Sequence, residues 1–510
     1  MDIERIDGSS GRCALHGVAG TREIERVALA AVPAFTLMAR AGDAVARLAL
    51  ALAPHARRVV VFAGPGNNGG DGLVAATRLH AMGRTVSVVL LAEAARLPAD
   101  AREAWCLAKA GGVDVRVTAQ GDVAQAGEGA ELVIDALLGI GITRAADGAI
   151  GAAIERIATL RAAGSRVLAI DVPSGLDADR GSAFQPHAVI ADDTLCLLTA
   201  KPGLFTAEGR DRAGRVWLAP IGMAAPGASG DAWLAGRGDP SCRQLPRRHA
   251  EHKGSFGDVA VLGGAPGMEG AALLAARAAH GAGAGRVFIE LLGRDATAAS
   301  MLDVTRPELM WRSGWSNAPV ETLARTTVVC GCGGGDGVRA VLPRLLAIVG
   351  RLVLDADALN AIAVDTSLQA QLFARAGRGF STVLTPHPLE AARLLGGTTN
   401  SVQADRLVAA RSLASRFHAV VVLKGSGTVI ASPGELPRIG ATGNAALASA
   451  GTGDVLAGWL GGRWSADAAM AAFDVATRAV VEHGAAADPE QPGSLRAADL
   501  VEALHRLSRA

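Results

Sequence analysis

The stretch Val-Val-Val-Phe-Ala-Gly-Pro-Gly-Asn-Asn-Gly-Gly-Asp-Gly, from Val59 to Gly72, starts as an apolar strand and ends in a loop with five glycines. A helical pattern over Leu73–Met82 follows, which is the order of a βα unit in a parallel sheet. Gly64–Gly69 matches the G-x-G-x-x-G spacing of dinucleotide-binding loops, although a purely structural tight turn is an equal alternative. Neither reading needs the polar side chains that this loop also contains: Asn67, Asn68 and Asp71.

The alternation of apolar strands and Ala-rich helical patterns continues through the first half of the chain. Continuous apolar strands separated by helices predict a parallel sheet that is covered on both faces. The predicted strands are Arg58–Ala63, Thr85–Leu91, Glu131–Leu137, Arg166–Ile170 and Thr194–Leu198. Before them, Thr21–Ala53 is predicted as a helix with one interruption at Pro33.

A second alternation begins after Gly222–Pro246, a segment that loses periodicity and collects Gly, Pro, Ser and Asp. The strands predicted in this half are Asp258–Leu262, Arg286–Leu291, Thr327–Cys330, Arg351–Leu354, Thr382–Leu384 and Val420–Leu423. The halves do not align as a repeat. The sequence therefore predicts an α/β protein with two different domains, at 1–225 and 241–510, and a linker at 226–240.

Composition narrows the function classes. The chain has 510 residues, half of them hydrophobic, and a formal net charge of +1, which argues against a nucleic-acid or membrane-surface partner. The six cysteines show no zinc spacing, and neither a secretory signal nor an apolar run of transmembrane length is evident. We therefore expect a cytoplasmic protein with no nucleic acid and no membrane among its partners, and a homo-oligomer.

Polar residues follow other predicted strands of the first half. Asp135 ends one strand, and Asp171 and Ser174 follow the next. In an open parallel sheet these loops meet at the carboxyl edge, beside Asn68. Oxygen donors gathered in one crevice suit a hard cation, whereas the alternative is that the two aspartates cap helices or turns.

The second half has its sharpest motif at Gly443–Gly458, where a loop of small residues leads to Asp454 at the start of an apolar helix. Free backbone N–H groups beside a carboxylate fit phosphoryl transfer, in which amides stabilise the moving charge and the carboxylate accepts a hydroxyl proton. The alternative is an N-capping aspartate. His387 and Lys424 also follow strands, although either residue taken singly could be structural.

The first half resembles the NAD(P)H-hydrate epimerase family in Gly64–Gly72, Asp135–Gly141, Asp171–Asp177 and Lys201–Leu204. The resemblance implies a potassium ion held by Asn68, Asp135 and Ser174, and a catalytic role for Asp171. It further implies that the hydrated cofactor is bound by Asn67, Asn68, Gly69, Gly70, Asp71, Gly139, Ile140, Gly141, Ile142, Thr143, Arg144, Ala145 and Asp171. Ala39 departs from the acid of many relatives.

The second half resembles the ribokinase-like superfamily, and within it the NAD(P)H-hydrate dehydratases, in His252–Gly257, Gly263–Gly267, Leu354–Asn360 and Thr385–Glu390. The resemblance implies hydrate contacts by Ala271, Gly335, His387 and the catalytic Asp454. It implies Mg²⁺ with ADP or ATP, bound by Lys424, Gly425, Ser426, Gly427, Thr428 and Gly453. Ala445 and Cys332-Gly333-Gly334 depart from the usual pattern, which bears on Gly335.

Together the resemblances imply a Rossmann-like epimerase domain followed by a ribokinase-like dehydratase domain. Such a protein would interconvert the R and S epimers of NADH hydrate and NADPH hydrate. It would then dehydrate the S epimer to NAD(P)H with ADP, or ATP, giving AMP, or ADP, and phosphate. The alternative enzyme is a small-metabolite kinase for a vitamin or pyrimidine, fused to a nucleotide-binding domain. A non-enzymatic nucleotide sensor is a further alternative, although Asp135, Asp171 and Asp454 are all present.

Overall fold

The structure is a computed structural model that describes residues 3–118, 122–222, 230–244, 246–293, 303–488 and 493–509. The chain forms two compact units, one of Met1–Asp7 and Cys13–Ala232, the other of Gly8–Arg12 and Trp233–Ala510. Each unit contains its own largely parallel sheet with helices packed on it. The predicted α/β class with two domains is confirmed.

The first unit is built on an eight-stranded sheet in which only β1 is antiparallel to its neighbour. In spatial order the strands are β1 (Glu4–Ile6), β9 (Arg215–Ala219), β8 (Asp193–Leu197), β7 (Arg166–Ile170), β6 (Leu132–Ala136), β3 (Arg58–Ala63), β4 (Thr85–Leu90) and β5 (Asp114–Val117). All five predicted strands are present. A short strand β2 (Cys13–Leu15) lies outside this sheet.

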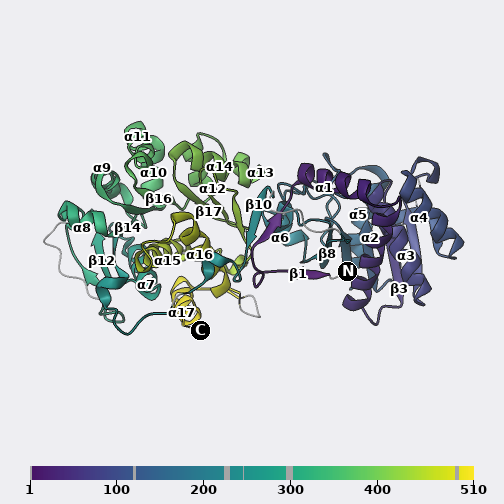
Figure 1. Cartoon of the computed structure of the whole chain (residues 1–510), viewed down its shortest axis with the longest axis horizontal. Helices are drawn as coiled ribbons and strands as arrows, with labels where there is room; N and C mark the ends of the chain where they lie inside the picture. Colours follow the sequence, from purple (N-terminus) through teal and green to yellow (C-terminus); the bar gives the residue numbers. More distant parts are fainter. Residues whose placement is uncertain are drawn as a thin grey trace. The chain divides into compact units, whose positions relative to one another are not determined.

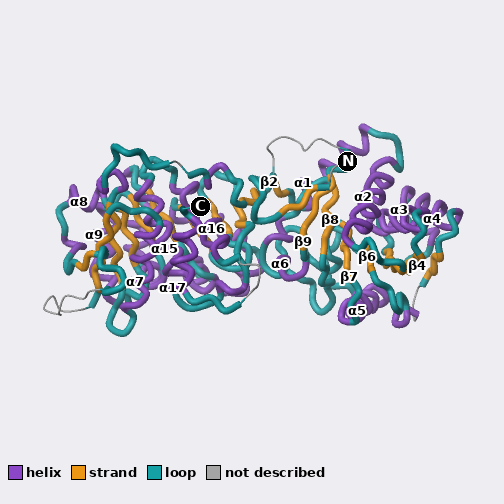
Figure 2. The backbone as a smooth tube through the Cα atoms, turned by 90° about the horizontal axis from the view of Figure 1, so that it is seen from below, coloured by secondary structure: helices purple, strands orange, loops and turns teal. Residues whose placement is uncertain are grey.

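Helices cover both faces of this sheet, and Figure 2 shows α2, α3 and α4 on one face and α5 on the other. Val59, Val61 and Ala63 of β3 belong to one apolar core, whereas Val60 and Phe62 belong to the core on the opposite face. A strand buried on both faces explains the continuous apolar run in the sequence. The helices are α1 (Val18–Ala31), α2 (Thr36–Leu52), α3 (Asn67–Ala81), α4 (Ala99–Ala110), α5 (Gly148–Ala162) and α6 (Gly209–Arg212).

The predicted interruption at Pro33 separates α1 from α2, which meet at a bend of 114°. In the described part of the chain, no single helix has the length and apolar character needed to cross a membrane. Only the bent pair of α1 and α2 meets those two criteria when its helices are taken together.

The strand order reverses direction between β3 and β6, because β4 follows β3 on one side and β6 to β9 extend the other. Phe62 of β3 lies opposite Asp135 of β6 in the parallel register. A reversal of this kind opens a crevice at the carboxyl ends of the strands, where ligands of open α/β sheets bind. The topology thus places the loops after β3, β6 and β7 around one crevice.

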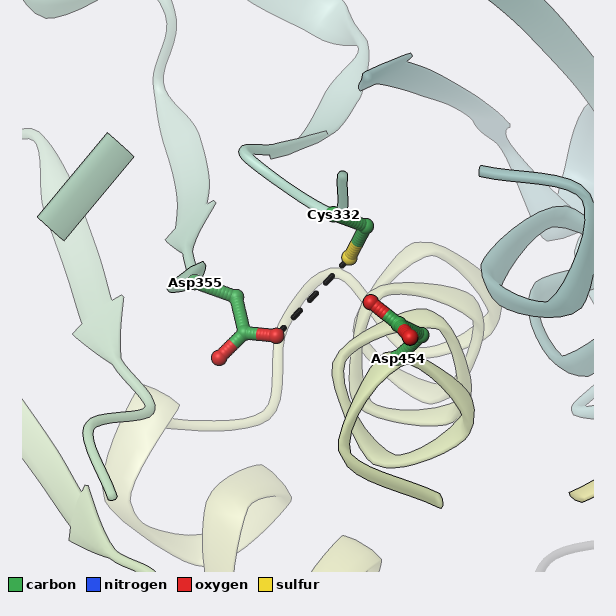
Figure 3. A group of neighbouring side chains, drawn as sticks. All are labelled: Cys332, Asp355 and Asp454. Carbon is green, nitrogen blue, oxygen red and sulfur yellow. Dashed lines mark hydrogen bonds between the residues drawn. The ribbon is translucent and has the colours of Figure 1, made fainter. Parts of the chain in front are cut away.

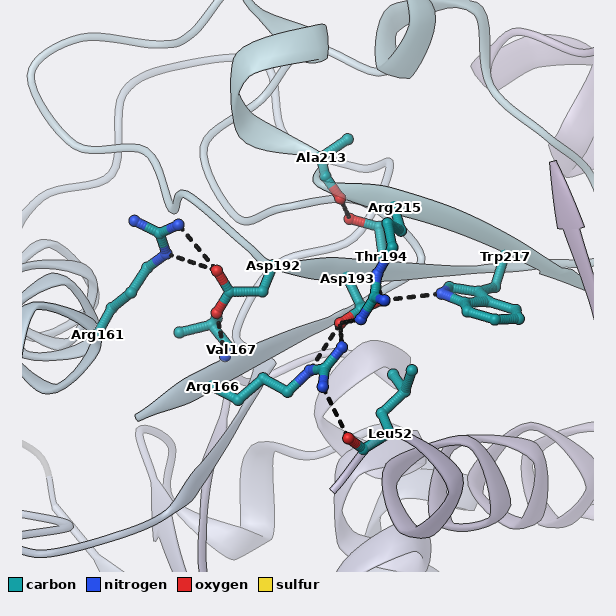
Figure 4. Close-up of polar contacts among 10 residues, drawn as sticks. All are labelled: Leu52, Arg161, Arg166, Val167, Asp192, Asp193, Thr194, Ala213, Arg215 and Trp217. Atoms are coloured by element: carbon teal, nitrogen blue, oxygen red, sulfur yellow. Dashed lines mark hydrogen bonds and ion pairs between the residues drawn. The ribbon is translucent and has the colours of Figure 1, made fainter. Parts of the chain in front are cut away.

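At the amino ends of the strands, Asp193 anchors a polar cluster (Figure 4). Its buried carboxylate accepts hydrogen bonds from the guanidinium groups of Arg166 and Arg215 at 2.8 to 3.1 Å and from the Trp217 indole at 3.0 Å. Arg166 also donates to the Leu52 carbonyl at the end of α2, at 2.7 Å. The cluster ties three strands and a helix together on the side away from the crevice.

Asp193→Ala is expected to lower the free energy of unfolding of the first unit by about 2 to 3 kcal/mol. Removing one partner of a fully buried pair costs about 3 to 5 kcal/mol, and here both arginines partly reach water. The measurement is the thermal inactivation midpoint of each activity, and only that of the first unit should fall. Asp114→Ala, which breaks an exposed pair with Arg116, is the matched control with about 0 to 1 kcal/mol expected. Equal midpoints for both variants would contradict the structural role of Asp193.

The sheet of the second unit runs in the order β13 (Met310–Trp311), β12 (Arg286–Leu291), β11 (Asp258–Gly263), β14 (Thr327–Cys330), β15 (Arg351–Leu354), β16 (Ser381–Leu384), β17 (Val420–Leu423), β18 (Val429–Ala431), β19 (Arg438–Gly440) and β10 (Ala232–Ala235). The strands from β13 to β17 are parallel, and β18 is antiparallel to both neighbours. The strand order reverses between β11 and β14, which places a second crevice at their carboxyl ends.

One apolar core lies between this sheet and the helices α7, α15, α16 and α17. Figure 1 shows α7, α15 and α17 close together, with α10, α12 and α14 forming a separate layer. The helices are α7 (Glu269–Gly281), α8 (Val320–Arg325), α9 (Val338–Ile348), α10 (Ala356–Val364), α11 (Thr366–Phe373), α12 (Pro388–Leu395), α13 (Thr399–Ala404), α14 (Arg406–Phe417), α15 (Thr452–Ala466), α16 (Ala472–Ala486) and α17 (Ala497–Leu507).

The segment predicted as a linker, 226–240, contains regular structure in its described part; residues 226–229 lie outside the described ranges. Strand β10 pairs in parallel with β19, and its residues Leu234 and Ala235 are fully buried. Residues 8–12, expected in the first domain, belong to the second unit. Arg12 forms a bidentate ion pair with the buried Asp239 at 2.8 and 2.9 Å, which holds this segment in place.

Candidate active sites

The first unit contains a cavity of about 440 Å³ at the carboxyl ends of its strands. Its lining includes Asn67, Asn68 and Asp71 of α3, the loop Gly139–Ile142, and Asp171. The structure therefore brings most of the predicted hydrate-binding residues into one place. Of the remaining ones, Thr143 and Arg144 are exposed, and neither they nor Ala145 are among the described residues that line the cavity.

Residues Asn67–Asp71 were expected to form a loop before a helix, but they are the first turns of α3. Glycine disfavours helix, yet close packing requires it here. A Cβ on Gly69 would lie 2.1 Å from the Gly64 carbonyl oxygen, and one on Gly70 would lie 2.5 Å from the end of Met38. The two glycines thus let α3 begin against the strand, with its free N–H groups at the cavity.

Asp135 and Ser174 form the polar floor beside the cavity, and both are fully buried. The Asp135 carboxylate accepts hydrogen bonds from the Ser174 hydroxyl at 2.6 Å, the Ser174 amide at 2.8 Å and the Leu137 amide at 3.2 Å. Burial raises the pKa of Asp135 to about 6, against the lowering effect of these hydrogen bonds. Among the described residues, no lysine or arginine pairs with this carboxylate. It is a buried acid without a protein cation.

The backbone of Leu138 contacts this pair through its carbonyl oxygen and its amide. The Ser174 hydroxyl lies 3.2 Å from the Leu138 carbonyl oxygen while accepting a hydrogen bond from the Leu138 amide at 2.9 Å. The side-chain nitrogen of Asn68 is buried and makes no hydrogen bond. Because the two ends of an asparagine amide are assigned from their partners, the reversed orientation would exchange the positions of the Asn68 oxygen and nitrogen.

Asp171 is paired with a fully buried lysine, Lys201, which follows β8. The Lys201 ammonium also donates to the Leu197 carbonyl at 2.9 Å. The backbone of Asp171 has φ +69°, an uncommon conformation for which aspartate and asparagine are among the best suited residues. The sequence prediction assigned no role to Lys201, although its position after a strand of the same sheet was a usable signal.

Three more carboxyl groups line the cavity: Glu25 on α1, Asp71 on α3 and Asp100 on α4. Burial raises the pKa of Asp71 well above its usual value, and the charges of Asp171 and Glu25 add to the effect. Burial and the charge of Asp171 also raise the pKa of Glu25, whereas Lys201 lowers it. The cavity thus places carboxyl groups of raised pKa beside an ion pair, an arrangement that suits acid–base catalysis.

In the second unit, Asp454 lies in the first turn of α15, after the N-cap Gly451 with φ +88°. It is therefore not the cap, which was the alternative interpretation. Figure 3 shows its carboxylate beside Asp355 and Cys332, and ligand atoms of the three side chains lie within 4.8 Å of one another. The Cys332 thiol donates to Asp355 at 3.8 Å. Burial, followed by the charge of Asp355, raises the pKa of Asp454 to about 6.

Lys424 lies next to this cluster, and its ammonium donates to Asp355 at 2.7 Å. The Thr385 hydroxyl donates to the same carboxylate oxygen, also at 2.7 Å. Burial lowers the pKa of Lys424, but the charges of Asp355 and Glu390 outweigh it and the net pKa is raised. A Cβ on Gly453 would lie 3.3 Å from the lysine nitrogen, so the start of α15 and Lys424 adjoin.

The buried Arg406 contacts the backbone just before the turn Gly425–Thr428. Its guanidinium donates to the carbonyl oxygens of Leu423 at 3.2 Å and Lys424 at 3.1 Å. Gly425 has φ +132°, and a Cβ there would lie 3.0 Å from the same guanidinium. The predicted nucleotide loop, with Ser426 and Gly427, is thus a fixed strand-to-strand turn between β17 and β18.

His387 is the N-cap of α12, where its Nδ1 accepts the amides of Leu389 at 3.1 Å and Glu390 at 3.4 Å. Burial lowers the pKa of His387, in line with this acceptor role. The Glu390 carboxylate in turn accepts a hydrogen bond from the His387 amide at 2.8 Å, and burial raises the pKa of Glu390 to about 7. His387 therefore has a structural role as the N-cap of α12, and about half of its side chain is exposed.

Ala271 and Gly335 lie on neighbouring segments at the β11 end of the crevice. A Cβ on Gly333 would lie 2.9 Å from the Ala271 side chain, and one on Gly335 would lie 3.1 Å from that of Ala265. The Gly335 amide donates to Asp357 at 2.8 Å. The close approach of these segments requires small residues, because a larger side chain would meet the facing segment.

Both halves of the chain are similar to known proteins. A family model described as YjeF-related protein N-terminus matches residues 34–203, and one described as NAD(P)H-hydrate dehydratase matches residues 259–506. A bifunctional NAD(P)H-hydrate repair enzyme of Escherichia coli (strain K12) is 36% identical over 472 residues, 89% of this chain and 85% of the relative. One from Coxiella burnetii is 34% identical over 481 residues, 92% and 93% of the two chains.

Among solved structures, an ADP/ATP-dependent NAD(P)H-hydrate dehydratase from Bacillus subtilis, co-crystallized with ATP and Mg²⁺, is 28% identical. The match has a TM-score of 0.44 and covers 53% of this chain and 95% of that one.

Two largely parallel sheets, each with titratable groups at the point where its strand order reverses, define a two-domain α/β enzyme with one candidate active site in each unit. The chain belongs to the family of bifunctional NAD(P)H-hydrate repair enzymes, whose members combine an epimerase and a dehydratase. The predicted family and function are confirmed, and the alternative of a vitamin or pyrimidine kinase is not favoured.

Proposed function

We propose that the cavity of the first unit is the epimerase site and that Asp171 with Lys201 transfers a proton of the oxygen that leaves or joins C6 of the hydrated nicotinamide ring. The observation that carries this proposal is a fully buried lysine paired with an aspartate on a cavity wall. Carbon C6 bears a hydroxyl and is bonded to the ring nitrogen. Loss of the hydroxyl gives a planar cation stabilised by that nitrogen, and water can then add to either face.

The proposed potassium site fits the residues present. Asn68, Asp135, Ser174 and the Leu138 carbonyl offer oxygen donors, the ligands that hard cations prefer. A bound cation would balance the charge of a buried carboxylate that has no protein cation, and the Asn68 oxygen would be a further ligand in the reversed orientation of its amide. When bound, K⁺ would supply positive charge at the crevice floor. Asn68, Asp135 and Ser174 would hold the segments at the ends of β3, β6 and β7 around the ion.

We expect Asp135→Ala to reduce epimerisation and to leave dehydration of the pure S epimer unchanged, because the carboxylate carries the only charge of the proposed cation site. Asp135→Asn separates loss of charge from loss of volume. The measurement is the thermal midpoint and the epimerisation rate in KCl and in tetramethylammonium chloride. A wild-type protein whose midpoint and rate are the same in both salts would refute the potassium assignment.

The crevice of the second unit is proposed as the dehydratase site, with Asp454 as general base. Asp454 accepts the proton of the C6 hydroxyl while the hydroxyl oxygen bonds to the terminal phosphorus of the nucleotide. The bond from that phosphorus to its bridging oxygen breaks, which releases AMP from ADP or ADP from ATP. Lys424 and the N–H groups at the start of α15 face the charge on the moving phosphoryl group. Phosphate then leaves C6 as a proton departs from the neighbouring ring carbon. Phosphorylation helps because phosphate is a better leaving group than hydroxide.

The nucleotide is proposed to lie along Lys424–Thr428 and Gly453, and the hydrate toward Ala271, Gly335 and His387. The carboxylates of this crevice suit Mg²⁺, which binds through oxygen and through substrate phosphates. ADP is the proposed phosphoryl donor, with ATP as the alternative. We further propose that the protein is a homo-oligomer and that it is cytoplasmic. Its six free cysteines fit the cytoplasm, where thiols stay reduced.

The experiment that tests the assignment of the two sites follows absorbance of the reduced nicotinamide. Full-length protein is given hydrated NADH as an R and S mixture, with ADP or ATP and Mg²⁺. Complete conversion of the mixture is expected, because the first unit feeds the R epimer to the second. Conversion that stops when the S epimer is used up would refute the epimerase assignment, and no conversion would refute the dehydratase assignment.

A further inference from the structure

Glu25 lies on the wall of the epimerase cavity, and none of the roles described above uses it. It projects from α1 together with Thr21 and Leu29, four residues apart on one helix face, and all three line the cavity. Glu25 is half-buried, and no hydrogen bond fixes its carboxyl group among the described contacts. The side chain is thus at the cavity and is not committed to a structural contact.

Epimerisation at C6 requires two proton transfers. One proton goes to the departing hydroxyl, and another leaves the water that adds to the opposite face of the ring. Asp171 with Lys201 accounts for one transfer, so a second titratable group has to reach the ring. Among the described residues that line the cavity, the carboxyl groups are those of Glu25, Asp71, Asp100 and Asp171.

The electrostatic surroundings distinguish Glu25 from its neighbours. The groups that face it are Asp171 from the loop after β7, Lys201 from the segment after β8 and Arg22 on its own helix, and Asp71 on α3 interacts with it as well. Burial and the charge of Asp171 raise its pKa, so it holds a proton to higher pH than an ordinary glutamate. Asp71 is also protonated more readily, but only 8% of it is exposed.

We propose that Glu25 is the general acid of the epimerase, an inference that rests on the epimerase function proposed for this cavity. The carboxyl proton of Glu25 passes to the C6 hydroxyl as the C–O bond breaks. The hydroxyl leaves as water, and the electron pair of the ring nitrogen forms the N=C bond. Water adds to the other face of C6 and gives its proton to Asp171. Exchange with solvent then resets both carboxyl groups.

The test uses full-length Glu25→Gln and Glu25→Asp, with Glu23→Gln as the matched control. Glu23 lies on the same helix but is exposed and paired with Arg26. We expect Glu25→Gln to lower kcat for epimerisation by about 100-fold to 10,000-fold, the range of general acid–base catalysis. KM and the dehydratase rate should stay unchanged, and Glu25→Asp should recover part of the loss.

The pH profile separates an acid from a merely structural residue. A general acid works only while protonated, so the wild-type kcat should fall as pH rises through its pKa, and Glu25→Gln should lose this alkaline decline. A Glu25→Gln variant with wild-type kcat, or with raised KM and an unchanged pH profile, would overturn the proposal. If wild-type protein does not epimerise at all, the site assignment itself fails. If Asp171→Asn alone is inactive, only the role of Glu25 fails.

Discussion

Asp454→Asn is expected to lower the rate of dehydration by about two to four orders of magnitude, the usual contribution of a general base. Asparagine keeps the shape of the side chain at the start of α15 and removes its ability to accept the C6 hydroxyl proton. Nucleotide binding should be largely retained. Epimerisation should be unaffected, because the other unit carries it. The measurement is single-turnover formation of NADH from the pure S epimer.

The same mechanism sets a pH dependence. The pKa of Asp454 is raised to about 6, and a base works only when deprotonated. The wild-type rate should therefore decline as pH falls through about 6 and be constant above it. Asp467→Asn, at the C-terminal end of the same helix, is the control for effects on helix stability. A near wild-type rate for Asp454→Asn would mean that another group accepts the proton.

Asp171→Asn is expected to lower epimerisation by about two to four orders of magnitude while dehydration of the S epimer continues. The substitution removes the charge that is paired with the buried Lys201. Asparagine tolerates the φ of +69°, so the loop after β7 should keep its course. The readout is exchange between the R and S epimers, separated by chromatography.

The control for this second effect is Asp177→Asn, in the same loop but outside the cavity lining, where the side chain accepts the amides of Asp179 and Arg180. It should epimerise at close to the wild-type rate. Rapid exchange of epimers by Asp171→Asn would leave Lys201 without a catalytic partner and would move the assignment to another carboxyl group of the cavity.

Much of the fold could be predicted because its strands are buried on both faces. Val59–Ala63 is apolar at every position, and such a run in a chain with helices has few other structures to form. Asp454 could be placed at a helix start, because glycine and threonine before it break the preceding structure. Strand β5 (Asp114–Val117) was missed, since half of its residues are charged, as edge strands often are.

The start of α3 and the partner of Asp171 depend on contacts between distant segments. Gly69 and Gly70 lower helix propensity, so a local pattern favours a loop, yet their lack of a side chain is what allows α3 to approach Gly64 and Met38. Lys201 is 30 residues from Asp171, and a lysine is ordinarily exposed. Only the sheet order brings the two together.

The return of residues 8–12 to the second unit has a consequence for dividing the protein. A chain begun at Ser241 would lack both β10, an ordered part of the dehydratase sheet, and the whole Arg12–Asp239 ion pair. A chain ended near residue 225 would carry Arg12 away from its partner. The two units are therefore interleaved along the polypeptide, and no single peptide bond separates them.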